Sequence, residues 1–411
     1  MALLVAKFGG TSVGTIERIK HAAAKIAAEA KQGHRVAVVV SAMSGETDRL
    51  IGLCHAISPL ADPEESDVVI ASGEQVSSGL MALALQQRGL RARAWQGWQI
   101  PLTSDGSHGR ARIENIAAER LLAHIEDGEI PVMAGFQGVT PQGRVTTLGR
   151  GGSDTSAVAL AAALKADRCD IYTDVDGVYT SDPRIVAHAR KLRRISFEEM
   201  LELASLGAKV LQTRSVELAM RYRVPVQVLS AFADDTGSDL PGTLLTNEDV
   251  SMESQLVTGI AHSRNEAKIA LTDIPDRPGM AAAIFSPLAE AGVNVDMIVQ
   301  TASNDSKATD MTFSVTKSDL ARTVEILTGQ QREIGYVRML TDPHVVKISI
   351  VGLGMRSHAG VAATMFRTLA EKGINIQVIS TSEIKTSVLI AEDYMELAVR
   401  SLHTAYGLDG A

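Results

Sequence analysis

The sequence predicts an α/β protein: a three-layer αβα domain around a mainly parallel sheet, followed by two smaller units with a βαββαβ pattern. Three observations carry this prediction. Up to residue 230, short apolar runs alternate with longer segments of helical periodicity, as in parallel sheets covered on both faces. Residues 231–258 are polar and contain glycine, proline and acidic residues, as a linker does. Beyond this linker, one pattern of residues occurs twice.

The composition narrows the class of protein. A chain of 411 residues, 45 % of them hydrophobic, suits two or three domains with separate cores. The net charge is −8 and basic residues do not cluster with aromatic ones, so we expect no nucleic-acid partner. The 2 cysteines, Cys54 and Cys169, have no metal or redox spacing, which favours a reducing compartment. Uninterrupted apolar stretches fall short of the ~20 residues that cross a bilayer, so we expect a cytoplasmic protein without a membrane partner.

The individual elements of the first domain follow from the alternation. Buried strands are predicted at residues 3–8, 35–42, 130–136, 170–175 and 224–230. Helices between them include 16–33 and 74–89, and a hairpin is expected at 139–147. Because parallel sheets bind ligands beyond the carboxyl ends of their strands, we expect the site at that edge.

The C-terminal repeat aligns residues 278–300 with 359–381 without gaps. The identical pairs are Gly279/Gly360, Phe285/Phe366, Leu288/Leu369, Glu290/Glu371, Gly292/Gly373 and Asn294/Asn375. Each copy fits a ferredoxin-like βαββαβ unit. The second copy ends after a helix at 392–403 and lacks its last strand, which the apolar alternation of 256–262 can supply. The expected segments are a first domain at 1–245, a linker and contributed strand at 246–263, and repeat units at 264–342 and 343–411.

The first candidate site segment is AKFGGTSVG, residues 6–14, in which a strand runs into Gly9 and Gly10. Consecutive backbone N–H groups and a helix N-terminus bind anions without any charged side chain. Lys7 stands at the carboxyl end of the strand, where its ammonium could bridge transferring phosphate oxygens. The alternative is a glycine-rich βα turn with a solvent-exposed lysine.

A second glycine turn, LGRGGSDTSAVALAAALKAD at 148–167, matches neither the dinucleotide fingerprint nor the ordinary P-loop. Its glycines allow the backbone to approach a ligand closely, and Ser153 can cap the helix that follows. Arg150 offers a planar fork to a carboxylate or phosphate.

Asp154 is unexpected in an anion site unless its partners are cations. An aspartate there can orient lysines and keep them charged beside a phosphoryl group, and Lys7 and Lys209 are the candidates. The turn therefore predicts a two-ended site, with phosphate on one side and a carboxylate substrate on the other.

Three further segments supply candidates that also have ordinary structural explanations. Ser41 ends a strand and Thr47 lies in the polar loop after it, where helix capping is the alternative. Glu74 falls in the first turn of a helix, where the helix dipole stabilises any carboxylate. Thr173 and Asp174 end another strand, where a base and ribose often rest.

The loop that follows that strand, TDVDGVYTSDPR at 173–184, completes the candidate set. Tyr179 could stack on a base and Arg184 could reach a polyphosphate. An ordinary Asp-Gly turn loop is the alternative.

Taken in order, these segments resemble the aspartate kinase family of the amino-acid kinase superfamily. The resemblance rests on FGGTSVG, SAMSGETDRL, SGEQVS, GFQG, TLGRGGSDTSA, YTDVDGVYTSDPR and LGAKVLQ. The C-terminal repeat resembles that family's paired ACT domains, including RSHAGVA and ISTSEIKTSVLI. The resemblance covers essentially the whole chain. It implies an ATP-dependent enzyme, with Mg²⁺ accompanying the nucleotide, that phosphorylates the β-carboxylate of L-aspartate to 4-phospho-L-aspartate, the first step of aspartate-family amino-acid biosynthesis.

The resemblance also implies a role for each matching residue. The catalytic group would be Lys7, Asp154 and Lys209. Aspartate would contact Ser41, Thr47, Glu74, Arg150 and Ser153. ATP would contact Lys7, Gly9, Gly10, Thr173, Asp174, Tyr179, Arg184 and Lys209. An inhibiting amino acid, lysine or threonine, would contact Asp276, Asn294, Gln300, Asn375, Ile376, Ser382 and Glu383. No protein side chains are expected to form a separate metal site, and the ACT units are expected to form a homodimer.

Two alternatives stay open at this point. Another amino-acid kinase could act on glutamate or acetylglutamate, although Glu74 argues against an acylated nitrogen, which has no charge to pair. A non-catalytic amino-acid sensor is the second, against which the presence of Lys7, Arg150 and Asp154 speaks. Thr301-Ala302 replaces the Asn-Val or Asn-Ile usual in the family, so the effector's identity stays open as well.

Overall fold

The computed structural model describes residues 1–207, 210–248, 256–302, 308–356, 358 and 360–409. Its contacts divide the chain into two compact units. The first comprises Met1–Val178, Lys191–Ala204 and Lys209–Asp249, and the second comprises Tyr179–Arg190, Ser205–Ala208 and Val250–Ala411. Two short segments from within the first 245 residues thus belong to the second unit.

The first unit is built on an 8-stranded sheet. In spatial order its strands are β10 (Arg194–Ser196), β12 (Thr243–Thr246), β11 (Val226–Ser230), β9 (Arg168–Thr173), β1 (Leu3–Phe8), β2 (Arg35–Val40), β6 (Ile130–Ala134) and β3 (Ala92–Trp95). Every neighbouring pair is parallel except β11 and β12. The predicted mainly parallel sheet is confirmed, and the ends of the predicted strands either coincide with the observed ends or differ by two residues.

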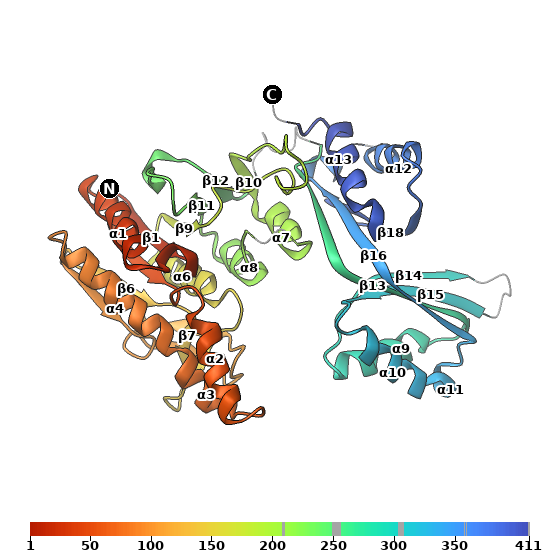
Figure 1. Ribbon diagram of the computed structural model, residues 1–411, viewed down its shortest axis with the longest axis horizontal. Coiled ribbons are helices and arrows are strands. Elements are labelled where there is room, and N and C mark those ends of the chain that lie inside the picture. The colour runs from red at the N-terminus through yellow and green to blue at the C-terminus, as the bar shows by residue number, and fades with distance from the viewer. Residues whose placement is uncertain (208–209, 249–255, 303–307, 357, 359, 410–411) are drawn as a thin grey trace. The chain divides into compact units, whose positions relative to one another are not determined.

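Helices cover this sheet on both faces, as Figure 1 shows. The helices of the unit are α1 (Ile16–Lys31), α2 (Glu46–Ile57), α3 (Pro63–Ile70), α4 (Ser72–Gln86), α5 (Glu119–Glu126), α6 (Gly152–Leu164), α7 (Phe197–Ser205) and α8 (Thr213–Tyr222), with the short 3₁₀ helices η1 (Gly10–Val13) and η2 (Gly237–Asp239). Helices α1 and α4 pack against one another and share a core with the sheet that includes Ile26, Val38 and Leu85. Helix α6 packs against β1, β2, β9 and α8.

A smaller sheet adjoins the large one within the first unit. Its order is β5 (Ile113–Ile116), β4 (Leu102–Ser104), β7 (Gln137–Val139) and β8 (Val145–Thr147). Strands β7 and β8 form the predicted hairpin, which begins two residues earlier than expected.

One described stretch, Pro63–Gln86, which joins α3 and α4, is long and apolar enough to cross a membrane by length and composition. In the fold, 44 % of its apolar window is buried, and α4 packs on α1 and the sheet like a core helix.

The second unit contains a 6-stranded antiparallel sheet. Its order is β14 (Val295–Ala302), β15 (Ala308–Val315), β13 (Gly259–Pro275), β16 (Arg338–Val351), β18 (Lys385–Ala391) and β17 (Ile376–Thr381). Its helices are α9 (Met280–Glu290), α10 (Leu320–Gly329), α11 (Gln331–Ile334), α12 (Val361–Glu371) and α13 (Met395–Ala405), with η3 (Leu353–Arg356) and η4 (Glu392–Tyr394).

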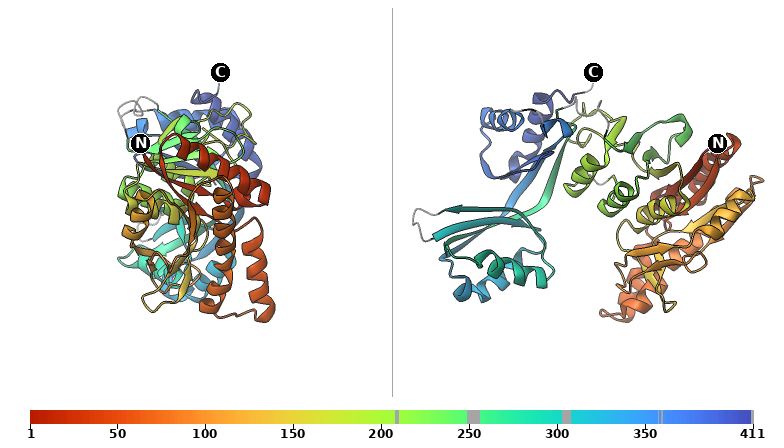
Figure 2. Two further views of the ribbon diagram at one scale, coloured as in Figure 1. Left: turned by 90° about the vertical axis from the view of Figure 1, so that its left-hand side faces the viewer. Right: turned by 180° about the vertical axis from the view of Figure 1, so that it is seen from behind.

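The long strands β13 and β16 belong to both copies of the repeat, and Figure 2 shows them running side by side. Gly259–Ser263 pair with Lys347–Val351, whereas Lys268–Thr272 pair with Arg338–Asp342. The first copy's own segment therefore supplies its last strand, at the start of β16, whereas the second copy receives its missing strand from the start of β13. Only the part of 256–262 from Gly259 onward is in this strand.

The duplication is visible in the backbone. Gly279 and Gly360 precede α9 and α12 with φ of +97° and +99°, in the left-handed region that favours glycine. Each copy buries its own core beneath its helices, around Phe313 in the first and Ile348 in the second.

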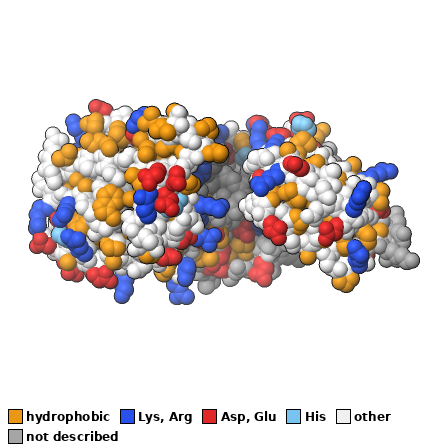
Figure 3. Space-filling model, turned by 90° about the horizontal axis from the view of Figure 1, so that it is seen from below, with side chains coloured by type: hydrophobic (Ala, Val, Ile, Leu, Met, Phe, Trp, Pro, Cys, Tyr) orange, Lys and Arg blue, Asp and Glu red, His pale blue; other side chains and the backbone are white. Residues whose placement is uncertain are grey.

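On the face drawn in Figure 3, acidic and basic side chains are interspersed within each unit.

Candidate active site

The candidate site lies at the carboxyl edge of the parallel sheet, where β9, β1, β2 and β6 end. Side chains alternate between the faces of a strand. In β1, Ala6 and Phe8 join the core beneath α1 and α4, so Lys7 between them points to the opposite face. Helix α6, which carries Asp154 in its first turn, covers that face.

Lys7 and Asp154 form an ion pair, with Nζ 2.5 Å from Oδ1. Their side chains are 10 % and 12 % exposed, so the pair is largely shielded from water. The Lys7 ammonium also lies against the glycine turn, because a Cβ on Gly9 would stand 3.4 Å from Nζ. The structure thus brings together the first glycine turn and the head of α6. Lys209, the second predicted cation, lies outside the described residues.

Glu74 is a buried acid at this edge. It is 3 % exposed, and its Oε1 accepts a hydrogen bond from the Ala42 N–H at 2.9 Å. Its Oε2 is buried and makes no hydrogen bond within the described part of the chain. Burial raises the pKa of Glu74 to about 7, and the Ala42 bond only partly opposes this. A buried carboxylate oxygen without a partner is suited to a cation supplied from outside.

The second glycine turn has a conformation that its glycines make possible. Gly149 and Gly151 have φ of +74° and +71°, and a Cβ on Gly151 would stand 1.9 Å from Cγ of Gln212. Gly151 itself is the N-cap of α6 and provides no side-chain hydrogen bond. The expectation that Ser153 caps this helix is therefore wrong, because the left-handed glycine already occupies the cap. Arg150, at the apex of the turn, is exposed.

Two residues that the sequence analysis missed hold this turn in place. Asp67 is 1 % exposed and accepts hydrogen bonds from Thr147 N and Oγ1 and from Gly109 N. Arg214 donates to the Leu148 carbonyl at 2.7 Å. Neither residue lies in a recognisable motif, so the sequence gives no signal of its role.

Phe136 was missed as well. It follows β6 with φ of +66°, a conformation that costs a non-glycine residue free energy. Its N–H donates to Ser156 Oγ at 3.1 Å, and its carbonyl accepts from Leu148 N at 2.9 Å. These bonds tie the end of β6 to the glycine turn and to α6.

The first glycine turn differs from its prediction in one respect. It leads into the four-residue 3₁₀ helix η1, and α1 begins only at Ile16, after Thr15 caps Arg18 N. The Gly9 N–H already donates to the Tyr172 carbonyl at 3.2 Å, a bond that competes with the predicted contact to phosphate. A Cβ on Gly10 would lie 3.0 Å from the Ala42 carbonyl, so glycine permits this close approach.

The remaining substrate and nucleotide candidates also lie at strand ends. The Ser41 carbonyl accepts from Ser77 Oγ at 2.7 Å, and the same hydroxyl lies 3.2 Å from the Glu74 carbonyl. Thr47 is partly exposed in the first turn of α2, whose N-cap is Gly45 and not a side chain. Thr173 and Asp174 end β9 and hydrogen bond to one another at 3.2 Å.

Tyr179 and Arg184 are part of the second unit. The Arg184 side chain is 87 % exposed and pairs with Asp182 at 2.7 Å.

The predicted effector residues lie on equivalent parts of the two repeat copies. Asn294 and Asn375 directly precede β14 and β17, and both are exposed. Gln300 lies on β14, opposite Met311 of β15. Asp276 is exposed in the loop before α9. Ile376 begins β17, and Ser382 and Glu383 lie in the turn that follows it.

Family models match this architecture. The amino acid kinase family matches residues 2–230, and ACT domain models match residues 269–329 and 348–406.

The similarity to curated relatives extends over the full length. An aspartokinase of Pseudomonas aeruginosa is 54 % identical over 411 residues, covering 100 % of this chain and 98 % of the relative. An aspartokinase of Mycobacterium tuberculosis is 47 % identical over 412 residues, covering 100 % and 97 %.

Solved structures are similar to this chain over nearly its full length. E. coli aspartokinase III in complex with aspartate and ADP, in the R-state, superimposes with a TM-score of 0.81 at 26 % identity, covering 98 % of this chain and 99 % of that one. The same enzyme in complex with lysine and aspartate, in the T-state, gives a TM-score of 0.77 at 26 % identity over the same shares.

Proposed function

The chain belongs to the aspartate kinases of the amino acid kinase family, and we propose that it transfers the γ-phosphoryl group of ATP to the β-carboxylate of L-aspartate. The product is 4-phospho-L-aspartate. The observation that carries the chemistry is the shielded ion pair between Lys7 and Asp154 at the carboxyl edge of the sheet.

The attacking group is already an anion, so the reaction needs no general base. Its barrier comes from bringing a carboxylate to a polyphosphate and from the charge on the equatorial oxygens in the transition state. Lys7 supplies positive charge to those oxygens. Asp154 holds the ammonium in place, so little reorganisation is needed when charge develops. Lys209 is proposed as the second cation.

Mg²⁺ is proposed to enter with the nucleotide. It is a hard cation that keeps several waters and binds phosphate oxygens in kinases, neutralising part of their charge. The first glycine turn fits a polyphosphate with its metal, because Gly9 places no side chain beside the Lys7 ammonium.

Glu74 is proposed to select the α-ammonium group of aspartate. Its buried Oε2 has no hydrogen-bond partner among the described residues, and burial raises the pKa of this carboxyl group. An ammonium ion placed there would stabilise the carboxylate. Arg150 is proposed to pair with the α-carboxylate, and Ser41, Thr47 and Ser153 to bind the remainder of the substrate.

The nucleotide is proposed to lie against Thr173 and Asp174, with Tyr179 and Arg184 from the loop that follows. The ACT units are proposed to bind lysine or threonine at Asp276, Asn294, Gln300, Asn375, Ile376, Ser382 and Glu383, and to form a homodimer. The lysine complex of the E. coli T-state relative supports an inhibiting role.

The product tests this proposal. Trapping the acyl phosphate with hydroxylamine should give a hydroxamate with ATP and aspartate, much less with glutamate, and none with N-acetylaspartate. Hydroxamate formation from glutamate at the rate seen with aspartate would contradict the proposed substrate.

A further inference from the structure

The segment Tyr179–Arg190 leaves β9 and returns toward β10, yet it is packed into the second unit. Its ends are joined by a hydrogen bond from Thr180 N to the Arg190 carbonyl at 2.9 Å. Between them, Val186 is 4 % exposed and belongs to the same hydrophobic core as Met365 of α12. We call this segment the docked loop.

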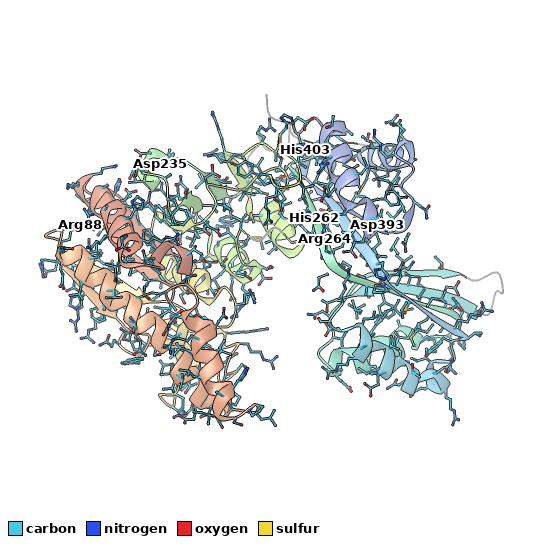
Figure 4. All side chains as sticks on the ribbon, in the orientation of Figure 1. Arg88, Asp235, His262, Arg264, Asp393 and His403 are labelled. Carbon is cyan, nitrogen blue, oxygen red and sulfur yellow. The ribbon has the colours of Figure 1, made fainter. Side chains whose placement is uncertain are left out.

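A series of hydrogen bonds through the buried Thr180 and His403 joins the docked loop to α13. Thr180 Oγ1 lies 2.8 Å from His403 Nε2, and His403 Nδ1 lies 2.8 Å from Asp409 Oδ1. Thr180 and His403 are each 0 % exposed. Figure 4 labels His403 on α13.

The hydrogen-bond partners of His403 fix the tautomer of its ring. An ionised carboxylate only accepts, and the bond from His403 lowers the pKa of Asp409, so Nδ1 carries the proton. Nε2 is then the acceptor, and the Thr180 hydroxyl donates to it. The same hydroxyl oxygen accepts from the Arg190 N–H at 2.9 Å. Both ring nitrogens of His403 and the Thr180 hydroxyl therefore have hydrogen-bond partners.

The order Asp409, His403, Thr180 resembles a nucleophile triad, but its geometry excludes that role. The Thr180 oxygen is 0 % exposed and already accepts from Arg190, so a substrate carbon cannot reach it. Buried and fully satisfied networks instead select one arrangement of the groups that they join.

Further bonds hold both ends of the docked loop. The Thr180 carbonyl accepts from Ile260 N of β13 at 2.7 Å. Arg400 Nε of α13 donates to the Ile185 carbonyl at 2.8 Å. Ala189 forms a β-bridge with Asp409, so the residue that orients His403 also pairs with the far end of the loop.

We propose that Thr180, His403 and Asp409 form a positioning device that fixes the docked loop to the ACT unit and thereby holds Tyr179 and Arg184 for the nucleotide. The second part rests on the proposed function, which places these two residues at ATP. Loss of the device should release the loop and weaken ATP binding, while the proposed aspartate site, at the end of β2 and on α2, α4 and the start of α6, keeps its affinity.

The test compares Thr180→Val, which removes the hydroxyl at nearly constant shape, with Thr180→Ser, which retains it. Hydrogen exchange of peptides covering 179–190 should be about tenfold faster in Thr180→Val, because two bonds are lost and His403 Nε2 and the Arg190 N–H are left without these partners. KM for ATP should rise about tenfold, with KM for aspartate unchanged. Thr180→Ser should behave like the parent protein.

Asp409→Ala provides a second variant at a partly exposed position, so that a folding defect of Thr180→Val does not decide the result. It should speed exchange in the same peptides and raise KM for ATP to a smaller extent. Unchanged exchange in both Thr180→Val and Asp409→Ala would overturn the proposal.

The variant Arg184→Ala distinguishes a failure of this inference from a failure of the proposed nucleotide role on which it rests. If it raises KM for ATP while Thr180→Val speeds exchange and leaves KM for ATP unchanged, the docked loop binds nucleotide without needing the device, and the inference fails. If Arg184→Ala and Tyr179→Ala both leave KM for ATP unchanged, the assigned nucleotide role fails, and the purpose of the device fails with it.

Discussion

The ammonium group of Lys7 lies 2.5 Å from Oδ1 of Asp154, and both side chains are almost entirely shielded from water. One residue comes from β1 and the other from the first turn of α6. Removing either partner of such a pair leaves a poorly hydrated charge without compensation. The two residues therefore act as one unit, and a substitution at either position is expected to affect phosphoryl transfer.

Glu74→Gln should weaken apparent aspartate affinity and leave ATP affinity unchanged. If the α-ammonium binds the ionised Glu74, this carboxyl group must lose its proton before aspartate binds at pH values below its pKa of about 7. Its aspartate affinity should then fall up to about tenfold per pH unit below 7 and level off above it. The variant should show weaker affinity without this pH dependence.

Titration calorimetry with aspartate between pH 5.5 and 8.5, on the order of one measurement per half unit, checks this. Glu119→Gln is the matched control, because Glu119 is also in the first turn of a helix but is exposed. Parallel pH profiles for the parent and Glu74→Gln would exclude Glu74 from the ammonium site.

Glu74 should also make the free energy of unfolding depend on pH. Burial raises the pKa of Glu74 from 4.5 to about 7, so the folded protein holds a proton that the unfolded chain releases. The group's contribution to the free energy of unfolding is therefore full below about pH 4.5, declines as pH rises to about 7 and is constant above. The total change is at most about 3 kcal/mol.

Urea unfolding of the parent and Glu74→Gln across this range isolates the effect. The difference in unfolding free energy should shift in favour of the variant as pH rises, and should stop changing above about 7. A difference that stays constant with pH would show that the acid is not held neutral.

Much of this architecture could be predicted from the sequence because it depends on local pattern. Alternating apolar strands and helices determine a parallel sheet, and the carboxyl ends of its strands determine where ligand groups meet. The contact between Lys7 and Asp154 follows from charge, since an acid inside an anion site requires a cation. The duplicated ACT units follow from repeated glycines such as Gly279 and Gly360.

What could not be predicted depends on contacts between distant segments. Nothing near Thr180 indicates that its partner is His403, so the sequence does not reveal that the docked loop belongs to the ACT unit. Asp67 and Arg214 support the glycine turn through hydrogen bonds between segments that are far apart in the sequence. Ser153 was expected to cap α6 because serine favours N-cap positions, but the N-cap is Gly151, whose φ is positive.

Gly151→Ala should damage the site more than the same change at another glycine with positive φ. Gly151 has φ of +71° with Gln212 atoms in the space of a Cβ, whereas Gly143 has φ of +82° and open space. Gly143→Ala should cost about 1 kcal/mol of strain alone. Gly151→Ala should add displacement of Gln212 and lower turnover.

Thermal unfolding and kinetics of the two variants measure the difference. Equal losses of stability and full turnover in both would show that the turn tolerates a side chain at Gly151.

Regulation through the ACT units makes a separate prediction. Lysine or threonine should bind the full protein, and Gln300→Ala should weaken that binding without altering turnover in the absence of effector. A coupling of about 1–3 kcal/mol between effector and substrate binding would be ordinary for such control. Calorimetric titration with each amino acid, beside an inhibition assay, measures both quantities. If neither binds at millimolar concentration, the repeat is structural in this protein.

The rate of acyl-phosphate formation in Lys7→Ala, measured in a single turnover at saturating ATP and aspartate, tests the central claim most directly. The account predicts a rate lower by about 100- to 1,000-fold, as for loss of one oxyanion-type donor, with the folded structure retained by circular dichroism. Lys20→Ala, an exposed lysine of α1, should keep the parent rate. A near-normal rate in folded Lys7→Ala would show that the ion pair with Asp154 is structural and that phosphoryl transfer depends on other groups.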